Sequence, residues 1–545
     1  MPLYQMNNSI SWMKTNKPKY IEWLLTGTGF LALFLFFYLL LPYHLFHREQ
    51  TQLFLFSTEM LVKYASHPAA LACFIGDFLT QFFYYEGVGP ALMAIILIFL
   101  GVVIYHLIAP YIARWAWLPT VVIVLWETGR QSGLAYPLSS SIALIGGGLI
   151  ALCCRRYMQA SWKLILPIGF MAIGASYYMF GYGVCLTALF LFHHRNIWVS
   201  ILLVIEALAL PSILRHTYLF TLKQAYSYPA TSWYNFPDRD REHLLAIDTE
   251  MYFGRFDKVE AILARGNFHA PFATYYYNLL NARQGLLPHN LMAFYQPASF
   301  GLFLPVVPTS TYITIYAANE LWFSLEDMTM AEHAAILGMI FSPNHTGVRA
   351  IKRLAEINLI NGDRVAAMKY LRILGKTFCY RNWAAQRIPG NQTLKIKRWL
   401  EQKRSLLPAT DTLRLSKDIS LSLRQLLYAN PENNMARDYL LCYDLLNKDI
   451  SAFAKDYQKF AFIGMPDRIY AEALLIYLAG SKASSEDVKK WRIPAHILNE
   501  FREYTWLYER NSGNGASLKA KYGNTYWYYF HYATMTRNKK EKSSK

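Results

Sequence analysis

The stretch Val88-Gly-Pro-Ala-Leu-Met-Ala-Ile-Ile-Leu-Ile-Phe-Leu-Gly-Val-Val-Ile-Tyr-His-Leu-Ile-Ala109 decides the fold class of this chain. It contains no aspartate, glutamate, lysine or arginine. Its length matches the roughly 20 apolar residues that a helix needs to cross the hydrocarbon core of a bilayer. A helix is also the element that satisfies its own backbone hydrogen bonds inside lipid. The stretch therefore predicts a membrane-spanning helix.

Similar apolar stretches lie on both sides of it. One of them, 134–154, carries the run Gly146-Gly147-Gly148, and small residues of this kind let membrane helices approach closely. Another, 164–192, is long enough for a tight hairpin of two short helices broken around Tyr177–Gly183. With that hairpin the sequence predicts about seven spans. The remaining candidates are 23–46, the short 116–126 and 197–214.

The composition changes after Leu214. The whole chain of 545 residues is 54% hydrophobic and 17% charged, but most of the charge falls after this point. We therefore predict an all-α protein with a polytopic transmembrane bundle at 22–214 and a soluble α-helical domain at 215–535. A cytoplasmic N-terminal segment, 1–21, precedes the bundle, and a basic disordered tail, 536–545, follows the domain.

The basic residues predict the orientation, because lysine and arginine gather in cytoplasmic loops. The N-terminus is predicted to be cytoplasmic, and an odd number of spans then exports the soluble domain to the periplasmic side of a bacterial inner membrane. If 164–192 is one span, that domain is cytoplasmic instead. One side receives Lys14, Lys17, Lys19, Arg114, Arg155, Arg156, Lys163 and Arg195, and the other only Arg48, Lys63 and Arg130.

The first outside loop, 47–87, is too polar to be a span and too rich in aromatic and aliphatic residues for an ordinary loop. Such segments are typical of interfacial helices that lie along the membrane surface. The loop also carries acidic residues, including Glu49 and Asp77. The next outside loop adds Glu127 and Arg130.

Glu206 lies alone within the last apolar stretch. An ionisable group at that depth is costly and usually faces the bundle interior or a wet cavity. One interpretation is a protonated carboxyl bonded to a neighbouring helix. The alternative is a functional group on a substrate path.

The soluble half contains three stretches that read as helix-turn-helix units. The clearest, 350–376, has Gly362-Asp363 at its turn and the small residue Ala367 on its second helix. Those offsets resemble the tetratricopeptide (TPR) pattern. The other two are 242–265 and 436–460. A TPR-like solenoid and an ordinary α-domain with helical hairpins both remain open.

Several function classes lack support in the sequence. The net charge of +18 is not accompanied by a nucleic-acid-binding motif, so no nucleic-acid partner is predicted. The six cysteines show no metal-binding spacing, and phosphate-loop, GxSxG and HExxH motifs are absent. No metal or cofactor is predicted. A disulfide between Cys379 and Cys442 is an open alternative if the soluble half is exported.

The whole chain resembles a multi-pass membrane protein family of Bacteroides-type bacteria with a TPR-like C-terminal part, a family that brings no activity with it. The resemblance covers most of the length. The residues that carry it are Phe78-Leu-Thr-Gln-Phe-Phe-Tyr84, Tyr439-Leu-Leu-Cys-Tyr-Asp-Leu-Leu-Asn-Lys-Asp449 and Lys521-Tyr-Gly-Asn-Thr-Tyr-Trp527.

The membrane half also resembles the GT-C glycosyltransferases in layout, with seven spans and interfacial helices in an acidic first outside loop. Some eukaryotic members carry TPR repeats on the exported side. The resemblance implies catalytic carboxylates at Glu49, Asp77 and Glu127, with Arg48 or Arg130 on the phosphate of a lipid-linked sugar. The Asp-Glu or DxD pairs typical of these enzymes are absent.

Three hypotheses follow for the function. The first is a scaffold that is embedded in the bilayer and displays a helical domain to protein partners during envelope assembly. The second is a GT-C-like transferase that uses a polyprenyl-phosphate-linked sugar. The third is a transporter or lipid-handling protein, for which Glu206 on a continuous wet path would be diagnostic.

Overall fold

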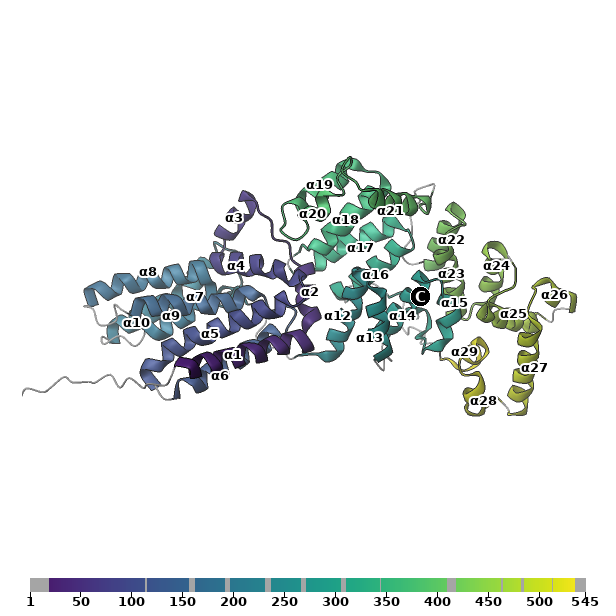
Figure 1. Ribbon diagram of the computed structural model, residues 1–545, viewed down its shortest axis with the longest axis horizontal. Helices are drawn as coiled ribbons and strands as arrows, with labels where there is room; N and C mark the ends of the chain where they lie inside the picture. Colours follow the sequence, from purple (N-terminus) through teal and green to yellow (C-terminus); the bar gives the residue numbers. More distant parts are fainter. Residues whose placement is uncertain are drawn as a thin grey trace, which may run out of the picture. The chain divides into compact units, whose positions relative to one another are not determined.

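The computed structural model describes residues 19–534 except 113–114, 156–161, 192–196, 231–236, 266–270, 305–309, 344, 409–417, 462–463, 482–484 and 512. Within these residues every regular element is helical (Figure 1). The chain forms two compact units. Unit 1 is Met1–Glu49 with Ser57–Arg239, and unit 2 is Gln50–Phe56 with Asp240–Lys545. The predicted cytoplasmic segment 1–21 falls almost wholly outside the described residues, as does the basic tail.

Unit 1 is a helical bundle with shorter helices at one end. Among the described residues four helical stretches are long and apolar enough to cross a membrane: Val88–Ile112, Leu138–Arg155, Trp162–Leu191 and Ile197–Leu214. Its helices are α1 (Lys19–Leu35), α2 (Pro42–Gln50), α3 (Thr58–Ala65), α4 (Ala70–Thr80), α5 (Val88–Ile112), α6 (Trp117–Gln131), α7 (Leu138–Arg155), α8 (Trp162–Phe180), α9 (Val184–Leu191), α10 (Ile197–Leu214) and α11 (Leu222–Ser227).

The first predicted span, 23–46, is not one straight helix. A π-helical turn, Phe36–Leu40, ends α1, and α2 leaves at 74° to the helix before it. The break lies at Leu41, whose backbone (φ −141°, ψ 45°) is not helical. Pro42 then starts α2, and proline favours the first position of a helix because its missing N–H is not needed there. Counted as one bent span, the pair brings the number of candidate spans to five.

The stretch Trp162–Leu191 folds back on itself. The hydroxyl oxygens of Ser176 and Thr187 are 2.8 Å apart. Eleven residues along one straight helix would separate them by roughly 16 Å. The chain therefore reverses between α8 and α9, at the 3₁₀ turn Gly181–Gly183, which lies within the break predicted from the sequence.

Helix α7 packs against α4, α5, α8 and α9. The glycine run on α7 allows this close packing. A Cβ added to Gly147 would lie 2.0 Å from the carbonyl oxygen of Gly183, and one added to Gly183 would lie 2.0 Å from the carbonyl oxygen of Ala143. The backbone of the α8–α9 turn thus lies directly against the backbone of α7.

Unit 2 is a succession of helices in which neighbours along the chain pack against one another. In α16–α19 and again in α22–α25, each helix contacts the next. The helices are α12 (Arg239–Tyr252), α13 (Phe256–Arg265), α14 (Pro271–Arg283), α15 (Leu287–Asn290), α16 (Tyr312–Ser324), α17 (Met328–Phe341), α18 (Val348–Asn361), α19 (Arg364–Gly375), α20 (Arg381–Ala385), α21 (Leu394–Ser405), α22 (Ile419–Ala429), α23 (Asn434–Leu446), α24 (Ile450–Phe460), α25 (Arg468–Gly480), α26 (Ser485–Lys490), α27 (Ala495–Arg510), α28 (Gly515–Tyr522) and α29 (Tyr526–Tyr532).

The three helix-turn-helix units read from the sequence are the pairs α12–α13, α18–α19 and α23–α24. In α18–α19, Gly362 has a left-handed backbone (φ +82°) that a side chain would disfavour. The carboxylate of Asp363 then accepts a hydrogen bond from the backbone N–H of Ala366 (2.9 Å), which caps α19. Ala367 is fully buried on α19, as expected for a small residue that lets this helix approach α18 closely.

A short piece of the first loop belongs to unit 2, although the sequence assigned the whole of 47–87 to the membrane half. In this strap, Gln50–Phe56, the carbonyl oxygen of Gln52 accepts from the N–H of Val348 (3.0 Å). The N–H of Phe56 donates to the carbonyl oxygen of Lys376 (2.8 Å). The strap therefore satisfies backbone groups at the start of α18 and just after α19.

Two acidic side chains in unit 2 give a pH-dependent prediction. Burial and the neighbouring carboxylate of Asp456 raise the pKa of Asp444. The folded state therefore favours the protonated form, and this contribution to stability is lost as pH rises through the raised pKa. Asp444→Asn should raise the melting temperature more near about pH 9 than near about pH 5, because the loss begins above the ordinary pKa of an aspartate and is complete only above the raised one.

The measurement is a thermal melt of the full chain at the two pH values. Glu432→Gln, at an exposed position just before α23, is the matched control and should show no such difference. An equal gain for Asp444→Asn at both pH values would contradict the prediction.

Candidate functional site

Glu127, in the last turn of α6, lies at the centre of a buried polar network in unit 1. Its Oε1 accepts hydrogen bonds from Ser141 Oγ (2.6 Å) and from the Tyr136 hydroxyl (2.8 Å). Its Oε2 lies 3.3 Å from Nη1 of Arg130. Glu127 is only 1% exposed. A carboxylate this deeply buried requires such partners, because an unpaired buried charge is very costly.

The network continues to α2. Gln131 donates from Nε2 to Ser141 Oγ (2.7 Å), and its Oε1 accepts from Nη1 of Arg48 (2.9 Å). One ring nitrogen of His44 lies 3.2 Å from the carbonyl oxygen of Gln131. Side chains from α2, α6 and α7 are therefore joined through the end of α6.

Tyr182, from the turn between α8 and α9, completes the network. Its hydroxyl donates to the carbonyl oxygen of Ser140 (2.9 Å) and lies 3.1 Å from the Tyr136 hydroxyl. The guanidinium of Arg130 lies 4.3 Å from the ring centre of Tyr136 and 5.9 Å from that of Tyr182. We call this group the Glu127 cluster; its members are Arg48, Glu127, Arg130, Gln131, Tyr136, Ser141 and Tyr182.

The structure brings three of the five predicted site residues together, namely Arg48, Glu127 and Arg130. Glu49 is buried next to Arg48 on α2. Asp77, on α4, makes a separate contact, because its Oδ2 accepts from the Tyr64 hydroxyl on α3 (2.6 Å). The acidic groups implied by the GT-C resemblance are therefore not all joined in one hydrogen-bonded cluster.

Glu206, the predicted intramembrane carboxyl on α10, is half-buried. One of its carboxyl oxygens is buried and has no hydrogen-bond partner among the described residues. The hydrogen bond to a neighbouring helix that one interpretation predicts is therefore not observed in this part of the chain. No group of three or more His, Cys, Asp or Glu side chains among the described residues is placed to hold a metal ion.

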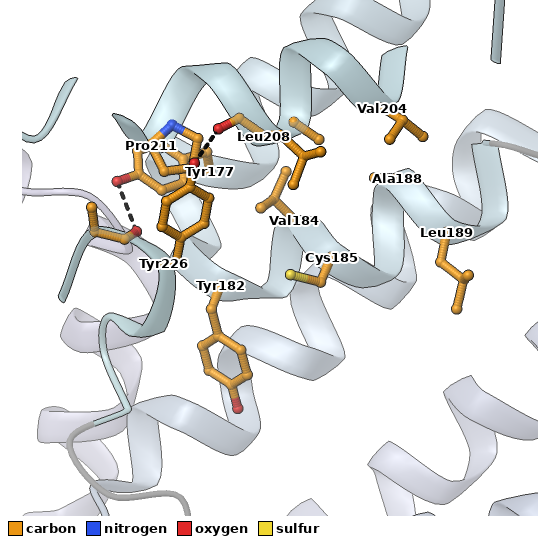
Figure 2. A pocket seen from close by; sticks show the side chains of 12 residues that line it. Tyr177, Tyr182, Val184, Cys185, Ala188, Leu189, Val204, Leu208, Pro211 and Tyr226 are labelled. Carbon is orange, nitrogen blue, oxygen red and sulfur yellow. Dashed lines mark hydrogen bonds between the residues drawn. The ribbon is translucent and has the colours of Figure 1, made fainter. Parts of the chain in front are cut away.

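An apolar cavity of about 380 Å³ lies among α8, α9, α10 and α11 (Figure 2). Tyr182 lines this cavity and, through its hydroxyl, also belongs to the Glu127 cluster. The cavity and the polar network thus share the side chain of Tyr182. The lining residues are Tyr177, Tyr182, Val184, Cys185, Ala188, Leu189, Val204, Ala207, Leu208, Pro211, Ala225 and Tyr226.

Comparison with known protein families shows the family to which the chain belongs. A family described as "Family of unknown function (DUF6057)" matches residues 17–533. The chain belongs to the DUF6057 family. No curated protein and no solved structure matches it. The DUF6057 match includes residues of both units, so the sequence that defines the family extends over both of them.

The DUF6057 chain contains a second group of buried charges, in unit 2, that sequence reasoning missed. Arg349, on α18, donates to both carboxylate oxygens of Asp248 on α12. Its Nη1 also donates to Oε1 of Gln50 in the strap (3.1 Å). The Tyr276 hydroxyl donates to Asp248 as well (2.5 Å). This pair connects α12, α14, α18 and the strap.

Glu320, on α16, extends this group. Its Oε1 accepts from Nη2 of Arg353 (2.5 Å), and its Oε2 lies 3.2 Å from Nη2 of Arg283. Burial alone would raise the pKa of Glu320, but the attraction of Arg353, Arg349 and Arg283 outweighs it and lowers the pKa to about 2. The resulting stability is present above the ordinary pKa of a glutamate and is lost as pH falls towards about 2. Asp248 and Arg349 are too far apart in sequence for any local pattern to indicate the pair.

Proposed function

We propose that this DUF6057 protein is a multi-pass protein of a bacterial inner membrane that displays a TPR-like domain as a scaffold for protein partners in the cell envelope. The observation that carries the proposal is the arrangement of unit 2, where successive helices pack on one another in α16–α19 and again in α22–α25. Stacked helix pairs create extended surfaces that bind other proteins. Unit 1 supplies the attachment to the lipid bilayer.

The reversal at Gly181–Gly183 supports export of unit 2. If α1, α5, α6, α7, α8, α9 and α10 each cross between the two sides, the number of passes is odd. A cytoplasmic N-terminus then places unit 2 in the periplasm. The eight residues of α9 extend only about 12 Å, which is less than the thickness of a bilayer. In this proposal α9 therefore starts inside the bundle, where the turn before it packs against α7.

One surface of unit 2 indicates the chemistry of the partner. Exposed basic side chains follow one another on α19, α20 and α21, with few acidic neighbours on these helices. A surface of one charge sign steers and favours a partner of the opposite sign. We propose an acidic protein partner for this basic surface, defined as Arg364, Lys369, Arg372, Lys376, Arg381, Lys395, Lys397 and Arg398.

The test is photo-cross-linking in cells. A photoreactive residue replaces Val365, which is 84% exposed on this surface. One discrete adduct is expected, and Lys369→Glu with Arg372→Glu should reduce its yield by about tenfold or more, because like charges would then face each other. The matched control is Arg510→Glu with Lys519→Glu, two exposed basic positions on α27 and α28. An adduct that survives the first reversal, or no discrete adduct, would contradict the proposal.

A second candidate, a GT-C-like transferase of lipid-linked sugars, rests on one observation. The Glu127 cluster, which contains a carboxylate and two guanidiniums, shares Tyr182 with an apolar cavity. In this proposal Glu127 takes the proton of an acceptor hydroxyl, and Arg48 and Arg130 bind the donor phosphate. Both oxygens of Glu127 are engaged and buried, so the cluster must open before it can act.

Glu127→Gln tests the transferase. The amide nearly matches the carboxyl in size and still offers an oxygen to Ser141 or Tyr136, but it cannot accept a proton. Sugar transfer from a polyprenyl-phosphate donor should fall by about 100-fold or more. The melting temperature serves as the control for folding. Undiminished transfer in Glu127→Gln, or no transfer by the wild-type chain, would exclude this function.

A further inference from the structure

The apolar cavity opens towards the surface that the bundle presents to lipid. Leu189 and Leu208, which line it, are 63% and 58% exposed. Leu208 lies on α10, which is long and apolar enough to cross a bilayer, and Leu189 lies on α9, which packs against α10. An exposed leucine on such a stretch faces hydrocarbon, so the mouth of the cavity lies where the acyl chains of the bilayer are the surrounding solvent.

The lining offers no unsatisfied hydroxyl to a polar ligand. Three tyrosines contribute their rings, but each hydroxyl is engaged with the backbone. Tyr177 donates to the carbonyl oxygen of Ala225 (3.2 Å), and Tyr182 donates to that of Ser140 (2.9 Å). Tyr226 donates to the carbonyl oxygen of Leu208 (Figure 2). A ligand in this space therefore meets ring faces and aliphatic carbon, which fit a hydrocarbon chain.

One end of the cavity is flanked by positive charge. Pro211, Ala225 and Tyr226 form this end. The backbone N–H of Arg215 donates to the carbonyl oxygen of Pro211, and Lys223 is exposed on α11, two residues before Ala225. Arg215 and Lys223 therefore lie within four positions of a lining residue, where the chain leaves the last long apolar helix, and Nε of Arg215 also donates to Nε2 of His216 (3.3 Å). A phosphate at this level would be attracted by both.

We infer that this cavity binds an anionic phospholipid of the bilayer, with one acyl chain among α8, α9 and α10 and the phosphate beside Arg215 and Lys223. An acyl chain of the adjacent bilayer would make dispersion contacts with the ring faces and aliphatic side chains of the lining. The inference is independent of the scaffold and of the transferase, because it concerns neither unit 2 nor proton transfer at Glu127.

The test is the retention of phosphatidylglycerol by the purified full chain in detergent, measured by native mass spectrometry. Val204→Trp fills the cavity and should lower retention by about tenfold. Ile205→Trp is the matched control, because Ile205 is the next residue on α10, is 54% exposed and does not line the cavity. It should retain the lipid like the wild type.

The role of the two basic residues is tested by comparing the retention of two lipids that differ in headgroup charge. Arg215→Gln with Lys223→Gln should remove the preference for phosphatidylglycerol over phosphatidylcholine, while the chain still enters the cavity. Equal retention by Val204→Trp and the wild type would overturn the inference, as would equal loss in Ile205→Trp, since lipid would then bind only to the outer surface.

A measurement on the wild-type chain covers the case in which Val204→Trp does not fold. The thiol of Cys185 lines the cavity. Phosphatidylglycerol should slow the alkylation of Cys185 by a lipid-soluble maleimide, with Cys185→Ser giving the background from the other cysteines. Unchanged alkylation upon addition of phosphatidylglycerol would also overturn the inference.

Discussion

Arg349→Ala is expected to lower the free energy of unfolding of unit 2 by about 3–5 kcal/mol, the usual cost of removing one partner of a buried ion pair. Arg349 is 2% exposed and Asp248 is fully buried. Without the guanidinium, Asp248 keeps the hydrogen bond from Tyr276 but no longer has its ion-pair partner. Glu320 also loses one of the three arginines that hold its pKa low.

The measurement is thermal unfolding of the full chain in detergent, followed by the loss of helical signal from unit 2. Arg364→Ala is the matched control, because Arg364 is an exposed arginine at the start of the next helix. Arg349→Lys should fall between the two, since an ammonium cannot make the two parallel contacts that a guanidinium makes with a carboxylate. A melting temperature for Arg349→Ala equal to that of Arg364→Ala would contradict the prediction.

Gly147→Ala is expected to destabilise unit 1 by about 3 kcal/mol, the upper end of the typical cost of overpacking, because the added methyl group would meet backbone atoms. The new Cβ would lie 2.0 Å from the carbonyl oxygen and 2.5 Å from the carbonyl carbon of Gly183. Backbone atoms cannot rotate away as a side chain would. Helix α7 or the α8–α9 turn must therefore shift.

Size-exclusion chromatography after heating shows this effect as a lower temperature at which monodisperse protein is lost. Gly174→Ala, on α8, is the matched control because nothing lies within 4 Å of its added Cβ. Alanine also favours a helix over glycine, so the control should be neutral or slightly stabilising. If both variants melted together, the close approach of α7 to the turn would be refuted.

Local patterns in the sequence predicted much of the helical architecture. The uninterrupted apolar run of α5 indicates a long apolar helix, and the glycines at positions 181 and 183 indicate a break. The pair Gly362-Asp363 indicates the turn between α18 and α19. Each of these signals acts within a few residues of its own position. The 74° bend after α1 was missed because the apolar run continues through it, although Pro42 was a usable signal. The strap was not predictable, because its backbone partners, Val348 and Lys376, lie far along the chain from Gln52 and Phe56.

The candidate site was predicted to the extent that its members are close in sequence. Glu127 and Arg130 were assigned to a loop after the stretch 116–126, but α6 continues to Gln131, and their pairing one helical turn apart follows from that helix rather than from the prediction. The placement of Asp77 against Tyr64 depends on how α3 folds onto α4, and no pattern in the sequence fixes that. The charged pair of Asp248 and Arg349 depends on tertiary packing in the same way.

The strap also sets an order on biosynthesis. The ribosome makes Gln50 long before Arg349, to which it is hydrogen-bonded in the finished protein. During translation this segment must stay accessible until α18 and α19 have been synthesised. A gene fragment that starts at Asp240 encodes unit 2 without the seven residues of the strap. A synthetic peptide of residues 50–56, added separately, could bind in the place of the strap.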